Sequence, residues 1–369
     1  MANSNLTEAK RAKNDEFYTQ YADIEKEISA YLEFNPDVFR GKTILLPCDD
    51  PEWSNFTKYF AQNFERLGLK KLISTSYAVE SKTYKGVYQP TLFETSAPYY
   101  DKKKTKVNGK IFTLTQDKTG DHVVNVDDLE WQYLQGDGDF RSAEIKALRD
   151  EADIIITNPP FSLFREFLAW IMEAGKQFIV ISNLNAITYK EIFPLIKNDK
   201  MWMGNGFHAG NAFFSTPFAN DYGEGIYNPE TGLVKFRNVC WFTNLDHGRR
   251  HQPLPLMTMS DNLKYSKHKE IQGKPSYDKY ENYDAIEVPF TDAIPSDYDG
   301  AMGVPISFLD KYSPEQFEII GSSRELGTPM SEIAEKGSYV QGGPRFYLSN
   351  GDGTYRRMYD RLVIKKRTK

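Results

Sequence analysis

Four consecutive residues, Asn158-Pro159-Pro160-Phe161, have the composition of a site for a planar ring that carries an amino group. Two adjacent prolines fix φ and remove two N–H donors, so nearby carbonyl oxygens are left as acceptors. The Asn158 side chain adds a further carbonyl acceptor, and Phe161 adds a flat apolar face. This combination suits a nucleobase with an exocyclic amine. The alternative is a proline-rich helix entry with Asn158 as N-cap, which we disfavour because the four residues rarely coincide with a strand-to-helix junction by chance.

The segments around this motif predict the elements that must position it. DIIIT at 153–157 reads as a buried strand and SLFREFLAWIMEAG at 162–175 as an amphipathic helix. Upstream, a strand at 42–48, a helix ending at Gly68 and a strand at 71–76 form a βαβ unit. The expected fold class is therefore α/β, with a mixed, mostly parallel sheet. Ligands of such sheets bind at the carboxyl ends of the strands, where Asn158 would lie.

The remaining segments give a domain division near residue 250. A helix is expected over 15–33, an insertion over about 78–135 with a hairpin at Asn108-Gly109, and a last strand over 234–245. Composition changes beyond 250, where the periodicity weakens; a short helix is expected to start in 313–321, and a final strand covers 361–366. We expect two domains, 1–250 and 251–369.

Composition excludes several classes of protein. The chain has 369 residues and a net charge of −5, and it contains no apolar run long enough to span a membrane and no signal-peptide pattern. Two cysteines fit a reducing compartment, and the five histidines show no metal-ligand spacing. Neither GxGxxG nor GxxxxGK occurs. We therefore expect a cytoplasmic protein with no membrane partner and no metal.

The charge is unevenly distributed. Residues 249–369 carry 18 basic against 17 acidic residues, whereas residues 1–248 carry 28 against 34. The last fourteen residues, RRMYDRLVIKKRTK, contain seven basic residues and one acidic residue, Asp360. A basic strip of this kind can follow a phosphate backbone, although a solvated basic tail explains it equally well. The candidate phosphate contacts are Arg249, Arg250, Arg356, Arg357, Lys365, Lys366 and Arg367.

These motifs together resemble the EcoRI-type adenine-specific DNA methyltransferases. Asn-Pro-Pro-Phe matches the family's catalytic Asp/Asn/Ser-Pro-Pro-Tyr/Phe signature, and similarity extends through DEFYTQYADIEKEI, CDDPEWSNFTKYFAQNFERLGLKKLI and NVCWFTNL. The resemblance implies a Rossmann-like, S-adenosylmethionine-dependent methyltransferase fold followed by a C-terminal mixed α+β target-recognition region. The order of the motifs resembles the γ arrangement.

The resemblance also implies roles for individual residues. Asn158, Pro159, Pro160 and Phe161 would form the catalytic turn. The S-adenosylmethionine site would be formed by Phe17, Tyr18, Thr19, Asp49, Asp50, Pro51, Asp139 and Phe140. The usual glycine-rich first turn is absent, so the choice between Asp49 and Asp50 stays open and either could instead cap a helix. No acid is assigned to the ribose, and Gly-Asp-Gly-Asp-Phe at 136–140 could be a plain turn.

The expected function is methyl transfer from S-adenosylmethionine to N6 of an adenine flipped out of double-stranded DNA, in a restriction-modification context. The same turn can methylate cytosine N4, adenine in RNA or a protein glutamine, so those substrates stay open. A catalytically idle DNA-binding relic of the fold is the alternative from another class. The arrangement can work as a monomer.

Overall fold

A computed structural model describes residues 17–47, 49, 54–78, 95, 100–208, 210–216, 222–223 and 225–367. The chain divides into two compact units, Met1–Ala186 with Met201–His247 and Ile187–Lys200 with Gly248–Lys369. The second unit thus begins close to residue 250 but also includes an earlier segment. None of the helices in the described ranges is long and apolar enough to cross a membrane.

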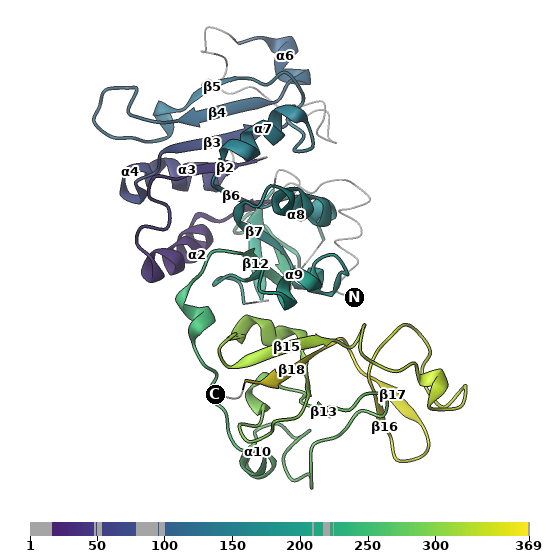
Figure 1. The fold of residues 1–369 in the computed structure, drawn as a ribbon. Coiled ribbons are helices and arrows are strands. Elements are labelled where there is room, and N and C mark those ends of the chain that lie inside the picture. Colours follow the sequence, from purple (N-terminus) through teal and green to yellow (C-terminus); the bar gives the residue numbers. More distant parts are fainter. Residues whose placement is uncertain are drawn as a thin grey trace. The chain divides into compact units, whose positions relative to one another are not determined.

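An eight-stranded mixed sheet forms the centre of the first unit (Figure 1). Its strand order is β5-β4-β3-β2-β6-β7-β12-β8, with β3, β2, β6 and β7 parallel and the others antiparallel to their neighbours. The strands are β2 (Thr43–Leu46), β3 (Lys71–Ser76), β4 (Lys110–Leu114), β5 (Glu130–Tyr133), β6 (Ile154–Thr157), β7 (Gln177–Asn183), β8 (Trp202–Met203) and β12 (Val239–Thr243). The chain is therefore mixed α/β, as the sequence predicts. The expectation of a mostly parallel sheet is wrong, because three of the pairings between neighbouring strands are parallel and four are antiparallel.

Helices cover both faces of this sheet, because the central strands are apolar on both sides. Ile44 and Ile154 face a core that contains residues of α2 (Tyr21–Phe34) and α3 (Asn55–Gln62), which α4 (Phe64–Leu67) follows. On the other face Phe164 of α8 (Phe164–Glu173) packs against Phe242, with ring centroids 5.7 Å apart. The helix α7 (Ala143–Glu151) leads into β6.

The expected hairpin at Asn108-Gly109 is wrong. These residues join α6 (Lys102–Val107) to β4, and the hairpin consists of β4 and β5 with a longer loop. Asn108 is extended, whereas a tight turn of that type needs positive φ. Glycine is required at position 109 for a different reason, because a Cβ there would lie 2.6 Å from the Ser76 carbonyl oxygen.

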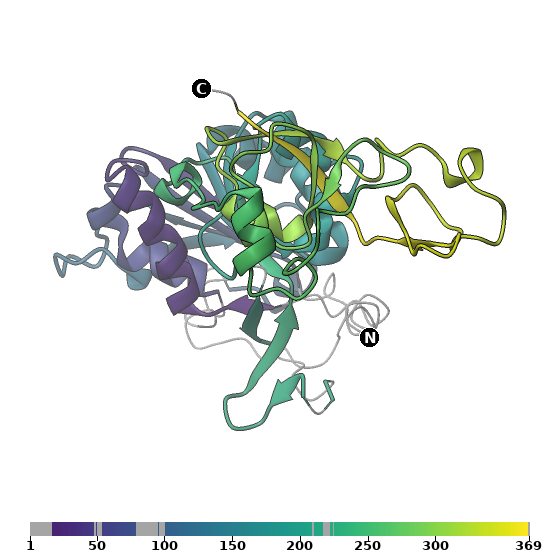
Figure 2. The same cartoon turned by 90° about the horizontal axis from the view of Figure 1, so that it is seen from below.

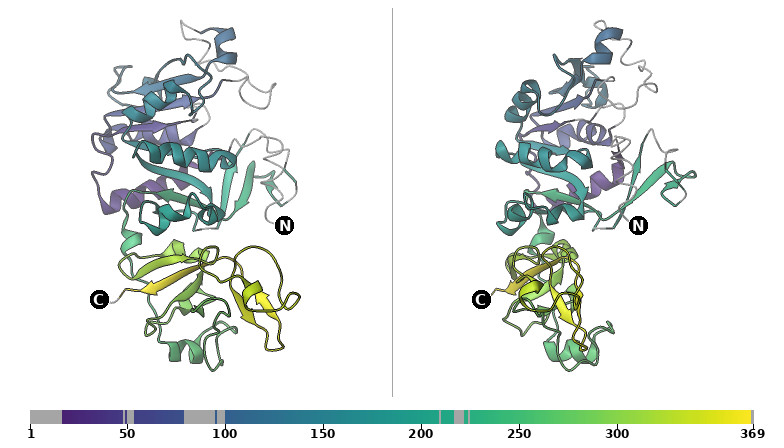
Figure 3. Two further views of the ribbon diagram at one scale, coloured as in Figure 1. Left: turned by 45° about the vertical axis from the view of Figure 1, so that its right-hand side comes forward. Right: turned by 90° about the vertical axis from the view of Figure 1, so that its right-hand side faces the viewer.

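The strand expected over 234–245 is also two strands in two sheets. Asn238 has φ of 57° and turns the chain between β11 (Leu233–Arg237) and β12. The former belongs to a four-stranded antiparallel sheet of order β1-β9-β11-β10, with β1 (Tyr18–Thr19), β9 (Asn211–Ser215) and β10 (Tyr227–Asn228). We call β9 and β11 the ribbon; it stands out from the main sheet (Figures 2 and 3).

The second unit is built around a four-stranded sheet of order β13-β14-β18-β15 and a separate pair, β16 and β17. Its elements are α9 (Phe193–Lys197), α10 (Met259–Tyr265), β13 (Ile286–Glu287), β14 (Met302–Pro305), β15 (Phe317–Ser322), β16 (Tyr347–Ser349), β17 (Tyr355–Arg357) and β18 (Arg361–Lys366). The helix start expected in 313–321 is wrong, because Phe317, Glu318 and Ile319 alternate buried, exposed and buried on β15. The final strand is confirmed as β18.

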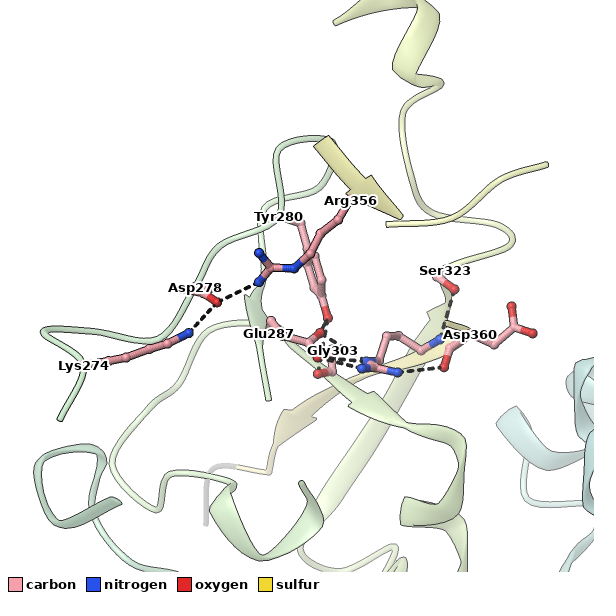
Figure 4. Close-up of polar contacts among 9 residues, drawn as sticks. Lys274, Asp278, Tyr280, Glu287, Gly303, Ser323, Arg356 and Asp360 are labelled. Carbon is pink, nitrogen blue, oxygen red and sulfur yellow. Dashed lines mark hydrogen bonds and ion pairs between the residues drawn. The ribbon is translucent and has the colours of Figure 1, made fainter. Parts of the chain in front are cut away.

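A buried ion pair lies inside the second unit (Figure 4). The Arg361 guanidinium donates to both carboxylate oxygens of Glu287, with the shortest contact at 2.7 Å, and the Tyr280 hydroxyl donates to the same carboxylate. Glu287 is 4% exposed and Arg361 8% exposed. The pair connects β13 to β18, two strands separated by β14.

Candidate active site

The Asn-Pro-Pro-Phe turn begins where β6 ends. In the main sheet β2 has β3 on one side and β6 on the other, so the chain order reverses between β2 and β6. Crevices that bind ligands in open α/β sheets form at such a reversal, beyond the carboxyl ends of the strands. Asn158 follows β6 directly, and Asp49 lies three residues after β2.

The Asn158 amide is oriented by the main chain of Phe17. Its Nδ2 donates to the Phe17 carbonyl oxygen at 2.7 Å. Because a carbonyl can only accept, this bond fixes which end of the amide is nitrogen. The other end, Oδ1, is buried and has no hydrogen-bond partner in the structure. A buried acceptor without a donor is costly, so this atom is an open position for a ligand N–H group.

Aromatic rings surround the turn on the side of the ribbon. Phe161 is half-buried, and its ring centroid lies 6.4 Å from that of Phe17 and 6.5 Å from that of Phe236 on β11. Phe17 in turn packs edge-on against Phe236 at 4.6 Å. These rings form an apolar wall beside the Asn158 acceptor.

The Phe17-Tyr18-Thr19 segment contacts both the Asn-Pro-Pro-Phe turn and α3, the first helix after β2. Its strand β1 pairs with β9, and the Thr19 carbonyl accepts from the Asn55 side chain at 2.7 Å. Thr19 is 1% exposed, and its Oγ1 makes no hydrogen bond in the structure. The site therefore contains two buried polar atoms without hydrogen-bond partners, Asn158 Oδ1 and Thr19 Oγ1.

Asp49 supports the turn through its side chain. The carboxylate is 5% exposed and accepts from the Ser54 hydroxyl at 2.7 Å and from the Thr157 hydroxyl at 2.6 Å. Ser54 in turn caps α3 through the Phe56 amide. Asp50 and Pro51 lie outside the described residues. Sequence reasoning missed Thr157, whose only signal is a hydroxyl at the end of an otherwise apolar strand.

The Asp139-Phe140 segment is packed against the main sheet. The Arg141 guanidinium donates to Asp139 at 2.8 Å, and this bond lowers the pKa of the carboxyl. Phe140 is fully buried and packs edge-on against Phe167 and Trp170 of α8. Gly138 has φ of 90°, and a Cβ there would lie 2.5 Å from the Ser76 carbonyl oxygen, so this turn requires glycine against the end of β3.

The basic residues singled out from the sequence all lie in the second unit, and most of them have local partners. Arg249 pairs with Asp310 at 2.6 Å and Arg250 with Asp199 at 2.8 Å. Three others contact local acceptors: Arg357 the Gly342 carbonyl, Lys366 the Ser296 carbonyl, and Arg367 the Pro314 carbonyl. Arg356 is half-exposed and 3.4 Å from Asp278, and Lys365 is exposed. The basic C-terminal residues thus lie in, or directly after, strands of two different sheets, β17 and β18.

Groups of histidine, cysteine and acidic side chains suited to hold a metal ion are not found in the ranges that the structure describes. The acceptors and rings at the carboxyl end of β6 instead match the requirements of an amino group on an aromatic ring.

The comparisons with known proteins agree with this chemistry. Residues 5–367 match the family described as "Adenine-specific methyltransferase EcoRI". The chain belongs to this family, and it is an adenine-specific methyltransferase. No solved structure matches it significantly.

Three curated relatives are type II methyltransferases. M.EcoRI of Escherichia coli is 44% identical over 86% of this chain and 89% of its own length. M.MpnI of Mycoplasma pneumoniae is 33% identical over 97% of both chains. M.MgeORF184P of Mycoplasma genitalium is 32% identical, also over 97% of both. The resemblance inferred from the motifs is thereby confirmed.

Proposed function

We propose that this chain transfers a methyl group from S-adenosylmethionine to N6 of an adenine that is flipped out of a specific double-stranded DNA sequence. The observation that carries the proposal is the buried Asn158 Oδ1, an acceptor without a donor that is held in place by the Phe17 carbonyl. Family membership supports adenine as the base and favours it over cytosine, RNA or a protein amide.

The strand order supports a Rossmann-like catalytic unit. Four strands are parallel, the antiparallel β12 lies beside β7, and the chain order reverses between β2 and β6. Open α/β sheets form a ligand-binding crevice beyond such a reversal. The buried Thr19 Oγ1 without a partner fits a polar cofactor at this crevice. We assign Thr19 to the methionine end of S-adenosylmethionine. When bound, the cofactor supplies a methyl group activated by its sulfonium.

The protein's own contribution to the reaction is positioning and charge stabilisation. The adenine N6 lone pair is delocalised into the ring and is a weak nucleophile. Hydrogen bonds from its N–H groups to Asn158 Oδ1 and the Pro159 carbonyl would draw N6 toward tetrahedral geometry and stabilise the positive charge that develops there. Phe161 would hold the ring by stacking, so that N6 is aligned with the methyl group.

The second unit would supply the contacts that select the DNA site. A base inside a duplex does not reach the turn, so it must be flipped at a cost of a few kcal/mol. Contacts from residues 251–369 would offset this cost, and the exposed Lys365 and half-exposed Arg356 are the best placed of the basic residues to reach phosphates. No second polypeptide is required by this arrangement, which is consistent with a monomer.

The test is incorporation of labelled methyl from S-adenosylmethionine into unmethylated duplex DNA, followed by nucleoside analysis. We expect label in N6-methyl-2′-deoxyadenosine. We expect Asn158→Ala to lower transfer by roughly 10²- to 10³-fold while DNA binding is retained. Asn35→Ala, at an exposed asparagine, is the matched control.

Other results would redirect the proposal. Label in cytosine, RNA or protein would keep the chemistry and change the substrate. If no label is incorporated and calorimetry detects no cofactor binding, the chain would instead be a DNA-binding protein that keeps the fold but has lost catalysis. Loss of DNA binding and transfer together in Asn158→Ala would point to a structural role for that residue.

A further inference from the structure

The outer face of the ribbon carries an exposed aromatic ring. Phe213 on β9 is 44% exposed, although its neighbours Ala212 and Phe214 are buried at 1% and 0%. The strand thus alternates in the manner of a half-buried sheet, except that a large apolar residue stands on the solvent side. Such a side chain either contacts a binding partner or stays exposed to water at a cost that the fold tolerates.

Two basic residues share that face with Phe213. Lys235 on β11 lies directly opposite Phe213, and Arg237 lies opposite Asn211. Residues opposite each other in an antiparallel pair project to the same side. Arg237 is exposed and Lys235 partly exposed. Neither takes part in a salt bridge in the described structure, and β9 and β11 contain no acidic residue.

The charge pattern is the opposite of that around the basic residues of the second unit. There, Arg249 and Arg250 each pair with an aspartate, whereas the ribbon presents two cations without acidic partners. The first 248 residues carry six more acidic than basic residues, so a cationic face within them is not explained by composition. Glu230 is in the turn between β10 and β11, outside both strands of the ribbon.

The inner face of the ribbon contacts the catalytic turn. Phe214 lies 6.2 Å and Phe236 4.6 Å from the Phe17 ring, and the Phe17 carbonyl holds Asn158. Strand β1 also pairs directly with β9. A ligand on the outer face of the ribbon would thus be separated from the residues that bind the base by the thickness of one sheet.

We propose that the outer face of the ribbon, formed by Phe213, Lys235 and Arg237, is a DNA-contact surface of the catalytic unit. This inference rests on the proposed function, because it takes double-stranded DNA as the partner. Lys235 and Arg237 contact phosphates of the DNA, and Phe213 packs against a sugar or base next to the target adenine.

The first experiment measures binding of the full chain to a labelled duplex of random sequence at several salt concentrations. Each phosphate contact contributes about −0.9 to the slope of log K against log salt. We expect Lys235→Ala/Arg237→Ala to make the slope shallower by roughly two contacts. The matched control is Lys70→Ala/Lys146→Ala, which removes two exposed lysines of the same unit and should leave the slope unchanged.

The second experiment measures methyl transfer to an unmethylated plasmid by Phe213→Ala. Loss of one stacked contact should lower kcat/KM by roughly 5- to 150-fold. Phe34→Ala, which removes a phenylalanine that is 46% exposed on α2, is the control and should keep the wild-type value. Circular dichroism of each variant checks that the fold is retained.

The outcomes separate the two proposals. If the wild-type chain methylates DNA and the ribbon variants keep its salt slope and kcat/KM, only the ribbon proposal is overturned. If the wild-type chain transfers no methyl group to DNA, the proposed function itself fails. A wild-type dimer in sedimentation that becomes a monomer in Phe213→Ala, with an unchanged salt slope, would assign the face to a second copy of the chain and overturn the DNA contact.

Discussion

The Thr157 hydroxyl donates to the Asp49 carboxylate at 2.6 Å and is also 2.9 Å from the Pro47 carbonyl oxygen. This contact joins the end of β6 to the turn after β2, across the point where the strand order reverses. Because Thr157 immediately precedes Asn158, the bond fixes the backbone from which the Asn-Pro-Pro-Phe turn starts. It also supplies a donor to a carboxylate that is withdrawn from water.

Thr157→Val should therefore weaken both folding and catalysis. Valine keeps the shape of threonine but leaves the buried Asp49 with one donor fewer, which costs about 1 to 3 kcal/mol of unfolding free energy. We expect kcat for methyl transfer to fall while KM for DNA stays within about twofold. Thr157→Ser keeps the hydroxyl and should restore most of the activity. Equal activity of the valine and serine variants would show that the bond is dispensable.

Asn158→Asp should be inactive, although aspartate occupies this position in part of the family signature. The Asn158 Nδ2 lies 2.7 Å from the Phe17 carbonyl oxygen, so an aspartate would place a second acceptor against it. The side chain would turn away, and the position of Oδ1 would be lost. We expect a loss of transfer similar to that of Asn158→Ala, measured with labelled cofactor. Wild-type activity in Asn158→Asp would mean that the Phe17 contact does not orient the site.

The sequence predicts the parts of the fold that depend on local pattern. KLISTS matches β3 residue for residue, and the Asn-Pro-Pro-Phe turn lies at the end of β6 because three consecutive isoleucines favour a buried strand there. The sequence does not predict the contact between Asn158 and Phe17. The acceptor is a backbone carbonyl 141 residues away, and every residue type has such a carbonyl. Nor does the sequence reveal that Asn238 divides β11 from β12, because their apolar residues read as one run.

Removing one partner of the buried ion pair in the second unit should be strongly destabilising. Glu287→Gln leaves the Arg361 guanidinium buried without a carboxylate, which we expect to cost about 3 to 5 kcal/mol. Glu287→Met combined with Arg361→Met removes both charges and should recover most of that loss. Urea unfolding of the two variants and the wild type measures the difference. If the double variant is no more stable than Glu287→Gln, charge burial is not the cause.

The lowered pKa of Asp128 predicts that the free energy of unfolding depends on pH. Burial alone would raise the pKa of its carboxyl, but backbone N–H groups of Asn125, Thr119 and Lys118 donate to it and lower the pKa to about 2. The folded pKa is below the unfolded value of 3.8, so the stabilisation is present above about pH 4 and is lost as pH falls toward 2.

The corresponding variant is Asp128→Asn, with Asp127→Asn at an exposed neighbour as its control. We expect Asp128→Asn to lower the unfolding free energy by about 1 to 2 kcal/mol at pH 6, and this difference from wild type to shrink toward pH 3. Urea unfolding between pH 3 and 6 tests this. A difference that is constant over that range would show that the carboxylate's charge is not involved.

The pairing of β1 with β9 joins two segments that are synthesised far apart in time. The carbonyl that orients Asn158 leaves the ribosome early, at residue 17, but the strand that holds β1 in place spans Asn211–Ser215 and emerges far later. A nascent chain that already contains the complete Asn-Pro-Pro-Phe turn therefore lacks the partner strand of β1. No substitution at position 17 removes the carbonyl, so the timing is a property of chain topology and is insensitive to the residue type there.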